Sequence, residues 1–370
     1  MPTSDTTIVA NDMREIAAAL GGRTAQLEDA TILLTGGAGF LGYYLINFFT
    51  HANATILKKK CRVICLDNFI RGVPPWLAAF EQSGAIRTVK ADITKFDPAA
   101  LGEIGYIIHA ASIASPMYYR QYPIETMDAN VIGLRILLDY AAAKMKSPRP
   151  LKSFLFFSSS EIYGDPLPDF IPTKEDFRGL VSCTGPRACY DESKRYGETL
   201  CVNFHQIHGV PVKIARPFNN YGPGLSIDDR RVIPDFCKNV LSGQNIVMLS
   251  DGSPTRTFCY IADAIAGYLL ALLSSHNGEP FNIGIETPEI SMRDMALTLL
   301  STAERELGIG GLQLITGTSD DKNYLVDNPD RRCPSIEKAR RLLGFNPTVS
   351  LEEGLRRALL WYSARIETGQ

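Results

Sequence analysis

Histidine, tryptophan and an excess of charge of either sign are scarce in this sequence. There are five His and two Trp among 370 residues, and 38 Lys and Arg nearly balance 40 Asp and Glu, for a net charge of −2. No two histidines stand at the spacing of metal ligands, so we expect no metal site. The near-neutral balance argues against nucleic acid or a membrane surface as a partner.

Long apolar runs and paired-cysteine motifs are also missing. No apolar run reaches the ~18 residues that a membrane-spanning helix needs, and residues 1–5 lack the basic start and apolar core of a signal peptide. The eight cysteines form no CxxC or Cys/His pattern, which favours reduced thiols in a cytoplasmic protein. The remaining composition, 45% hydrophobic and 21% charged, is typical of one large globular domain or two that pack closely.

Short apolar runs alternate with segments of helix length in the first 217 residues. Runs that are apolar almost throughout are typical of parallel strands that helices cover on both faces. The pattern predicts an α/β fold with a doubly wound parallel (Rossmann) sheet, which binds ligands at the carboxyl ends of its strands. The expected strands are 31–35, 62–67, 88–92, 106–111, 153–157 and 212–216, with a helix at 40–51.

The pattern changes after Pro217, where Gly and Pro become dense and the expected helices shorter. We therefore expect a Rossmann domain at 31–217 and a smaller α/β substrate-binding lobe mainly at 218–370, with about 254–276 returning to the first domain. Residues 1–30 form an N-terminal extension. Within it, 11–20 is typical of a short amphipathic helix with Asn11 or Asp12 as its cap, which we interpret as a packing or dimer-edge element.

A glycine-rich turn follows the first expected strand. Gly36, Gly39 and Gly42 are spaced GxxGxxG, which allows a tight turn, close approach of a pyrophosphate and donation from a helix N-terminus. Asp67 ends the second strand, where an acid can accept hydrogen bonds from ribose hydroxyls and repels a 2′-phosphate. NAD is therefore favoured over NADP, a preference that the nearby Arg71 could soften.

The next candidate contact is Asp92-Ile93, after the third expected strand. These two residues could hold the adenine of the cofactor. For Asp92 the alternative, a helix cap, is about equally plausible from the local sequence.

A Tyr-x-x-x-Lys pair, Tyr190 and Lys194, follows the fifth expected strand. Its i,i+4 spacing places both side chains on one helix face, where the ammonium can stabilise a phenolate, so that Tyr190 acts as a base near neutral pH. Ser159 lies just past that strand, where its hydroxyl can share a substrate proton or make a turn hydrogen bond. Glu161 is a candidate acid or base at the same edge.

The sequence resembles the extended short-chain dehydrogenase/reductases, the group of nucleotide-sugar epimerases, dehydratases and decarboxylases. The resemblance covers about Ala30 to Ala364. The motifs that carry it are TGGAGFLG at 35–42, HAAS at 109–112, SSSEIYG at 158–164, YDESK at 190–194, ARPFNNYGPG at 215–224 and RTFCYIAD at 256–263.

Within this group, three stretches resemble the UDP-glucuronate decarboxylases: GPRACYDESKR at 185–195, the loop with Ala114-Ser115-Pro116, Tyr119 and Pro123-Ile124, and DDRRVI at 228–233. The resemblance implies NAD as cofactor and a set of site residues. The implied cofactor contacts are Gly36, Gly39, Phe40, Leu41, Gly42, Asp67, Asn68, Asp92, Ile93, Ala110, Ala111, Ser112, Asn130, Tyr190 and Lys194. The implied substrate contacts are Pro116, Tyr119, Ser160, Asn219, Arg231, Arg256 and Tyr260, and the implied catalytic residues are Ser159, Glu161, Tyr190, Lys194 and Arg256.

Residues 159–161 help to choose between the reactions of this group. By the resemblance, 4,6-dehydratases have Thr-Asp-Glu here and 4-epimerases typically lack the glutamate, whereas this chain has Ser159-Ser160-Glu161. Serine is a poor acid, and at position 160 it leaves room for a substrate carboxylate that an Asp would repel. Arg256 resembles the arginine that faces this carboxylate, although a diphosphate or structural role stays open. Asn219 and Arg231 resemble residues that grip the diphosphate.

The leading hypothesis is NAD-dependent decarboxylation of UDP-glucuronate to UDP-xylose through a 4-keto intermediate. A 4-epimerase or 4,6-dehydratase acting on a related nucleotide sugar is the alternative. A non-catalytic NAD-binding regulator is a third, against which Ser159, Tyr190 and Lys194 speak. The resemblance also implies a homodimer through the segments 126–145 and 190–208.

Overall fold

Seven parallel strands form the central sheet of the computed structural model, which describes residues 5–318 and 326–368. Their order in the sheet is β11-β6-β5-β4-β1-β2-β3. The chain thus moves outward from β1 in one direction and then from β4 in the other, which opens a crevice at the carboxyl ends. The predicted doubly wound parallel sheet is confirmed. The strands are β1 Thr31–Thr35, β2 Arg62–Asp67, β3 Ile86–Lys90, β4 Tyr106–His109, β5 Ser153–Phe157, β6 Val212–Pro217 and β11 Pro280–Ile283.

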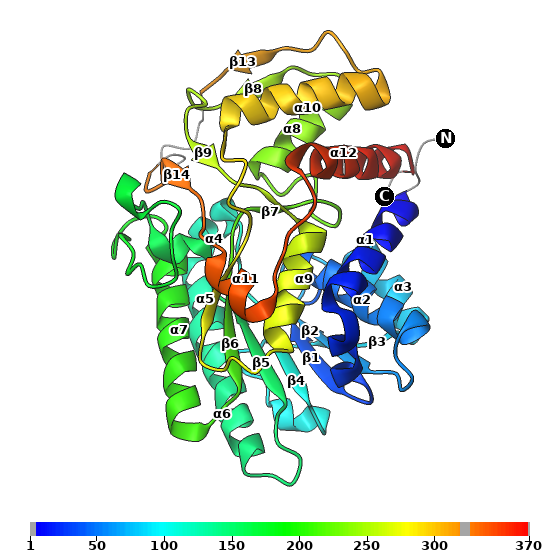
Figure 1. Ribbon diagram of the computed structural model, residues 1–370, viewed down its shortest axis with the longest axis vertical. Coiled ribbons are helices and arrows are strands. Elements are labelled where there is room, and N and C mark those ends of the chain that lie inside the picture. Colours follow the sequence, from blue (N-terminus) through cyan, green and yellow to red (C-terminus); the bar gives the residue numbers. More distant parts are fainter. Residues whose placement is uncertain (1–4, 319–325, 369–370) are drawn as a thin grey trace.

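Helices cover both faces of this sheet (Figure 1). Successive strand residues point to opposite faces, so Leu34 joins the core beneath α2 and α9 whereas Leu33 joins the core beneath α6 and α7. In the described ranges, no helix is both long and apolar enough to cross a membrane. The helices are α1 Asp5–Leu20, α2 Phe40–Thr55, α3 Pro75–Gln82, α4 Pro116–Gln121, α5 Pro123–Asp128, α6 Leu134–Met145, α7 Ala188–His208, α8 Val232–Leu241, α9 Ile261–Leu272, α10 Met292–Leu307, α11 Glu337–Leu343 and α12 Leu351–Thr368.

The expected strands agree with the sheet to within two residues at each end, and α2 continues four residues beyond its expected end at 51. The seventh strand, β11, was not predicted. It pairs with β6 after α9 has crossed back over the sheet, so the part of the chain that returns to the Rossmann layer extends to Ile283. Its four residues, one of them Pro, are too few for a strand pattern to stand out.

The second lobe lies above the carboxyl ends of the strands (Figure 1). Helices α8, α10 and α12 pack together there, beside a pair of short strands, β8 and β13. Two small sheets, β7-β10 and β12-β9-β14, connect this lobe to the Rossmann layer. These strands are β7 Asn220–Tyr221, β8 Ile246–Met248, β9 Thr255–Arg256, β10 Cys259–Tyr260, β12 Ile290–Ser291, β13 Leu314–Thr316 and β14 Arg331–Arg332.

The N-terminal helix α1 is packed into the fold and does not project from it. It lies against α2, α9 and α12, where its apolar face, including Ile8, Met13 and Ile16, is buried. The helix begins at Asp5, so Asn11 and Asp12 lie inside it, and the prediction that one of them caps the helix was wrong. The sequence pattern missed the first two turns because Thr6 and Thr7 are weak helix formers.

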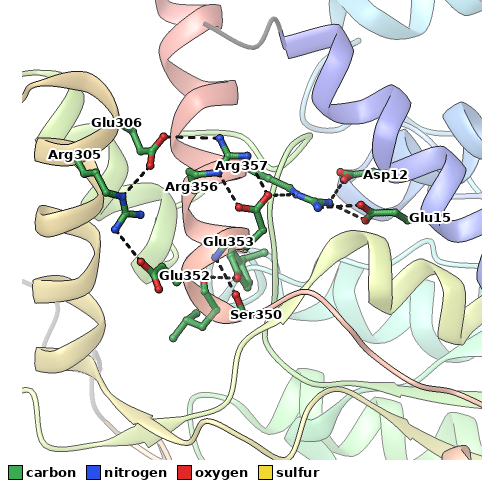
Figure 2. A network of polar contacts seen from close by, with 11 residues as sticks. Asp12, Glu15, Arg305, Glu306, Ser350, Glu352, Glu353, Arg356 and Arg357 are labelled. Carbon is green, nitrogen blue, oxygen red and sulfur yellow. Dashed lines mark hydrogen bonds and ion pairs between the residues drawn. The ribbon is translucent and has the colours of Figure 1, made fainter.

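Asp12 is fully buried and is the centre of a polar cluster. Its Oδ2 accepts hydrogen bonds from the hydroxyls of Tyr44 at 2.6 Å and Tyr260 at 2.7 Å. Its Oδ1 pairs with Arg357 Nη1 at 2.7 Å. Figure 2 shows how Arg357 of α12 also reaches Glu15 and Glu353, and how the ion pairs continue to α10. The first helix of the chain is thereby joined to the last.

Candidate active site

One cavity of about 1400 Å³ runs along the carboxyl ends of the strands, between the Rossmann layer and the second lobe. The glycine-rich turn lines one end. The lining continues past Tyr190 and Glu161 to residues of the second lobe such as Arg231 and Arg256. This is where a doubly wound sheet binds ligands, and a cavity of this size has room for a cofactor and a substrate together.

The glycine-rich turn at this end is shaped for close approach. Gly36 has φ +72°, and a Cβ there would lie 2.6 Å from the backbone N of Ala111. At Gly42 a Cβ would lie 2.1 Å from the Gly37 carbonyl O, so this glycine allows the helix to pack on the turn. Gly36 and Gly39 line the cavity whereas Gly42 does not. Gly42 therefore shapes the turn and is not itself a cofactor contact.

Asp67 closes the turn from the next strand. Its carboxylate accepts from the backbone N–H of Ala38 at 3.0 Å and of Phe69 at 2.8 Å, and burial raises its pKa. Arg71, which could have weakened the preference for NAD, instead pairs with Asp229 at 3.2 Å and lies over the ring of Tyr118. Within the described chain the Arg71 guanidinium is therefore already paired with a carboxylate. The acid at position 67 then favours NAD over NADP.

Most of the other implied cofactor residues also line the cavity. Asp92 does so while its Oδ1 accepts from the N–H and hydroxyl of Thr94 in a turn; no helix begins there, so the alternative of a helix cap was wrong. Asn130 does not line it: the amide is buried on a π-helical turn (residues 129–133) and donates to Ser193 Oγ at 2.9 Å. We therefore regard Asn130 as a support of α7. The lining set is Phe40, Leu41, Asn68, Ile93, Ala110, Ala111 and Ser112.

Tyr190 and Lys194 lie on one face of α7 beside Ser159. Lys194 Nζ donates to the Phe157 carbonyl O at 2.8 Å and lies 5.6 Å from the centre of the Tyr190 ring. Burial lowers the pKa of Lys194 to about 7 and raises that of Tyr190 to about 12, although a hydrogen bond with Ser159 acts in the other direction for Tyr190. Tyr190, Lys194 and Ser159 lie together as predicted. The protein alone, however, does not lower the pKa of the Tyr190 phenol.

Two loop residues were expected to contact the substrate beside Tyr190. Pro116 lines the cavity. Tyr119 does not; it is buried and stacks on Tyr190, with ring centres 5.1 Å apart and planes at 14°. Tyr119 therefore lies behind Tyr190 and holds the plane of its ring.

Glu161 does not have the surroundings of a general acid. Arg332 donates to both carboxylate oxygens at 2.6 Å, and Arg187 donates to Oε2. Burial opposes its ionisation, but the two guanidiniums outweigh burial and lower its pKa to about 2. The carboxylate is ionised at neutral pH and already occupied by strong donors, so the acid or base role predicted for it is not supported.

Arg187 and Arg332 were absent from the predicted site. Arg187 stands in the same GPRACYDESKR stretch as Tyr190, and its place three residues before the tyrosine was a usable signal. Arg332 lies on β14, a strand of only two residues, which no periodicity reveals.

Among the implied substrate residues of the second lobe, three of four line the cavity. Arg256 is buried and donates to the carbonyl oxygens of Thr255 at 2.8 Å and Asp330 at 3.1 Å. Arg231 pairs with Asp229 at 2.7 Å, and Asn219 donates to the Thr257 carbonyl at 2.9 Å. The fourth, Tyr260, is 1% exposed and faces Asp12 on the far side of the short β10 strand, so its substrate role was predicted wrongly.

Comparison with known proteins gives this geometry a context. A model of the NAD dependent epimerase/dehydratase family matches residues 32–284. The UDP-glucuronic acid decarboxylase 6 of Arabidopsis thaliana is 36% identical over 324 residues, which are 88% of this chain and 86% of that protein.

Two solved structures extend the comparison. A UDP-glucuronic acid 4-epimerase from Bacillus cereus, in complex with UDP-glucuronic acid and NAD, is 26% identical with a TM-score of 0.72, over 91% of this chain and 99% of that one. The dTDP-glucose 4,6-dehydratase DesIV of Streptomyces venezuelae, with NAD and TYD bound, is 26% identical with a TM-score of 0.75, over 92% and 98%. Both of these structures contain NAD. This cofactor also fits the cavity described above, with its glycine-rich turn, Asp67 and Lys194.

Proposed function

The chain belongs to the NAD-dependent epimerase/dehydratase family, and we propose that it decarboxylates UDP-glucuronate to UDP-xylose through a 4-keto intermediate. The glycine turn and Asp67 would hold the cofactor at one end of the cavity, and Asn219 and Arg231 would hold the diphosphate of the substrate at the other. The sugar would then lie between them, beside Tyr190.

The residues around Tyr190 suit the removal and return of one proton. As the phenolate, Tyr190 would take the proton of the sugar 4-hydroxyl with the help of Ser159, and the Lys194 amino group lies beside the Tyr190 ring. Bound NAD⁺ supplies the hydride acceptor for C4 and a positive charge that favours the phenolate. Once C4 is a ketone, the carboxylate at C5 is in the β position and can leave as CO₂. The enolate that remains would take up a proton at C5, and return of the hydride to C4 and of the proton from Tyr190 to the C4 oxygen would complete the pentose. Arg256, which lines the cavity, would face that carboxylate.

Decarboxylation is favoured over dehydration because no residue at positions 160 and 161, near Tyr190, is a suitable proton donor. Position 160 is a buried serine. The next residue, Glu161, also lines the cavity, but it is ionised and pairs with two arginines. Expulsion of a hydroxyl needs a proton donor, whereas loss of CO₂ from a β-keto acid does not. The decarboxylase relatives support the same choice.

Incubation of the protein with UDP-glucuronate and NAD tests this function. We expect release of CO₂ and a nucleotide sugar lighter by the mass of CO₂, measured by mass spectrometry. A product of unchanged mass with an inverted 4-hydroxyl would instead establish the 4-epimerase alternative, and loss of water would establish a dehydratase. Recovery of substrate alone in the presence of bound NAD would reject all three.

We further propose a homodimer in which α5, the π-helical turn after it, α6 and α7 face a second copy. These neighbouring segments expose large apolar side chains: Ile124 is 59% exposed, Ile132 44%, Tyr196 51% and Ile207 71%. Exposed apolar groups on adjoining helices are typical of protein interfaces. The packed pair formed by α6 and α7 runs along one side of the molecule in Figure 1, where a partner has access.

Light scattering at micromolar concentration should give the mass of two chains. Ile132→Glu is expected to yield monomers because it buries a charge in this contact. Ile315→Glu, at a 41% exposed position on β13 of the other lobe, is the control and should remain dimeric. A monomeric wild-type protein would contradict the proposed dimer.

A further inference from the structure

An ion pair joins the two walls of the cavity at its cofactor end. Arg71 lies in the loop that follows β2, residues 68–73, and Asp229 lies in the second lobe, shortly before α8. Arg71 Nη1 is 3.2 Å from Asp229 Oδ2, and both residues line the cavity. The loop comes directly after Asp67, where an acid can accept hydrogen bonds from the cofactor ribose. The pair therefore connects the second lobe to the part of the Rossmann layer that would hold the adenosine.

The loop 68–73 has few other attachments. Phe69 packs against the main hydrophobic core and anchors the start of the loop. Within the described part of the chain, the other hydrogen bonds of the loop all lie within residues 67–72. Ile70 and Val73 are 50% and 58% exposed, so apolar burial does little to hold the tip. Segments of this kind open at a low cost in free energy. The contact made by Arg71 is therefore the main restraint on the tip of the loop.

Arg71 makes a second contact, with an aromatic ring. Its guanidinium carbon lies 4.6 Å from the centre of the Tyr118 ring, where the electrons of the ring attract a cation. Tyr118 belongs to α4 and also lines the cavity. Three segments thus meet at one guanidinium: the loop after β2, helix α4 and the loop before α8. A planar guanidinium can pair with a carboxylate and stack on a ring at once, which an ammonium group does less well.

The Asp229 end of the contact is firmly held. Asp229 is 1% exposed, and its Oδ1 lies 2.7 Å from Arg231 Nε. Its backbone N–H donates to the Ser226 carbonyl at 3.1 Å, and its backbone carbonyl accepts from Ser115 Oγ at 3.2 Å. The side chain of Arg71, in contrast, is 46% exposed. Arg71 is thus the movable partner, and its release would free the tip of the loop from the second lobe.

We propose that Arg71 straps the loop 68–73 to the second lobe and thereby slows the release of NAD. Opening of the loop requires Arg71 to leave both Asp229 and Tyr118, which raises the barrier to departure of the cofactor. Arg71 acts through the loop and not on the reacting atoms, so it is a positioning residue. This role concerns the cofactor and does not depend on which sugar reaction the protein catalyses.

The rate of cofactor release tests this role without any sugar substrate. Protein loaded with NADH is mixed rapidly with a large excess of NAD⁺, and the loss of bound NADH is followed by its emission on excitation of tryptophan. The two tryptophans of the chain, Trp76 and Trp361, both line the cavity, so energy transfer to NADH reports the bound cofactor. Arg71→Met should speed release roughly threefold to thirtyfold, the scale of one part-exposed ion pair and one cation–π contact. Arg71→Lys, which keeps the charge but not the planar group, should have a smaller effect.

A double-mutant cycle separates the strap from a change within the loop itself. Arg71→Met should speed release less in an Asp229→Asn protein than in the wild type, because only the contact with Tyr118 is then left to lose. Equal acceleration in the two backgrounds would mean that the ion pair does not slow release and would overturn the proposal. An unchanged release rate in the Arg71→Met protein would overturn it as well.

Arg87→Met is the matched control. Arg87 is an exposed residue of β3, the next strand of the same sheet, and it does not line the cavity. Release of NADH from this variant should keep the wild-type rate. If Arg87→Met sped release as much as Arg71→Met, the effect would come from the loss of a positive surface charge in general, and the strap would be rejected.

Discussion

Tyr190→Phe should lower the rate of CO₂ release from UDP-glucuronate roughly a thousandfold, the scale of a lost acid–base group. The substitution removes one hydroxyl and leaves the ring that stacks 5.1 Å from Tyr119, so the fold and NAD binding should be retained. Initial rates at saturating NAD, with NAD affinity measured alongside, separate the loss of chemistry from a loss of cofactor.

The control for this variant lies on the same helix. Tyr196 is 51% exposed, and Tyr196→Phe, which keeps the ring that we place in the dimer contact, should keep the wild-type rate within about a factor of two. A Tyr190→Phe protein as active as the wild type would remove this phenol from the mechanism and would revive the hypothesis of a regulator that only binds NAD.

Asp12→Ala should lower the free energy of unfolding by about 3–5 kcal/mol, because two buried tyrosine hydroxyls and one guanidinium lose a charged acceptor together. Tyr44 and Tyr260 are fully or almost fully buried, and each donates to Oδ2 of Asp12. Urea unfolding followed by circular dichroism measures the change.

Glu15→Ala is the matched control for Asp12. Glu15 lies one turn further along α1 and binds the same Arg357, but its side chain is 42% exposed. Its removal should cost less than about 1 kcal/mol, as for other exposed ion pairs. Equal effects of the two substitutions would show that α1 is held by its apolar face and not by the buried cluster.

The pH dependence of the same cluster gives a second measurement. Burial raises the pKa of Asp12 from 3.8 to about 6, so the folded protein holds this proton more tightly than the unfolded chain. Its contribution to stability is complete below the unfolded pKa and is lost as the pH rises through the folded value. The stability of Asp12→Asn relative to wild type should therefore increase between pH 4 and pH 7, which urea titrations at several pH values can follow.

The features that the sequence predicted well are those encoded by neighbouring residues. β1 is five consecutive buried residues followed by glycines, and the spacing of Tyr190 and Lys194 within one helix places them together. The features that the sequence did not predict came from contacts between distant segments. Glu161 becomes a counter-ion through Arg332, 171 positions away, and Tyr260 turns inward to Asp12, 248 positions away.

Very short strands were a second limit. β9, β10 and β14 have two residues each, and two residues carry no alternation from which a face could be assigned. In β10, Tyr260 was therefore placed in the site by its motif, although its side chain packs into the core.

The attachment of α1 has a consequence for the order in which the chain can fold during synthesis. Its partners are α2, then α9 and finally α12, whose Arg357 is 345 positions from Asp12. N-terminal segments usually fold first as they emerge. Here α1 can contact only α2 until α9 has been made, and its apolar face is fully covered only when α12 has left the ribosome. Helix α12 thus completes the burial of α1.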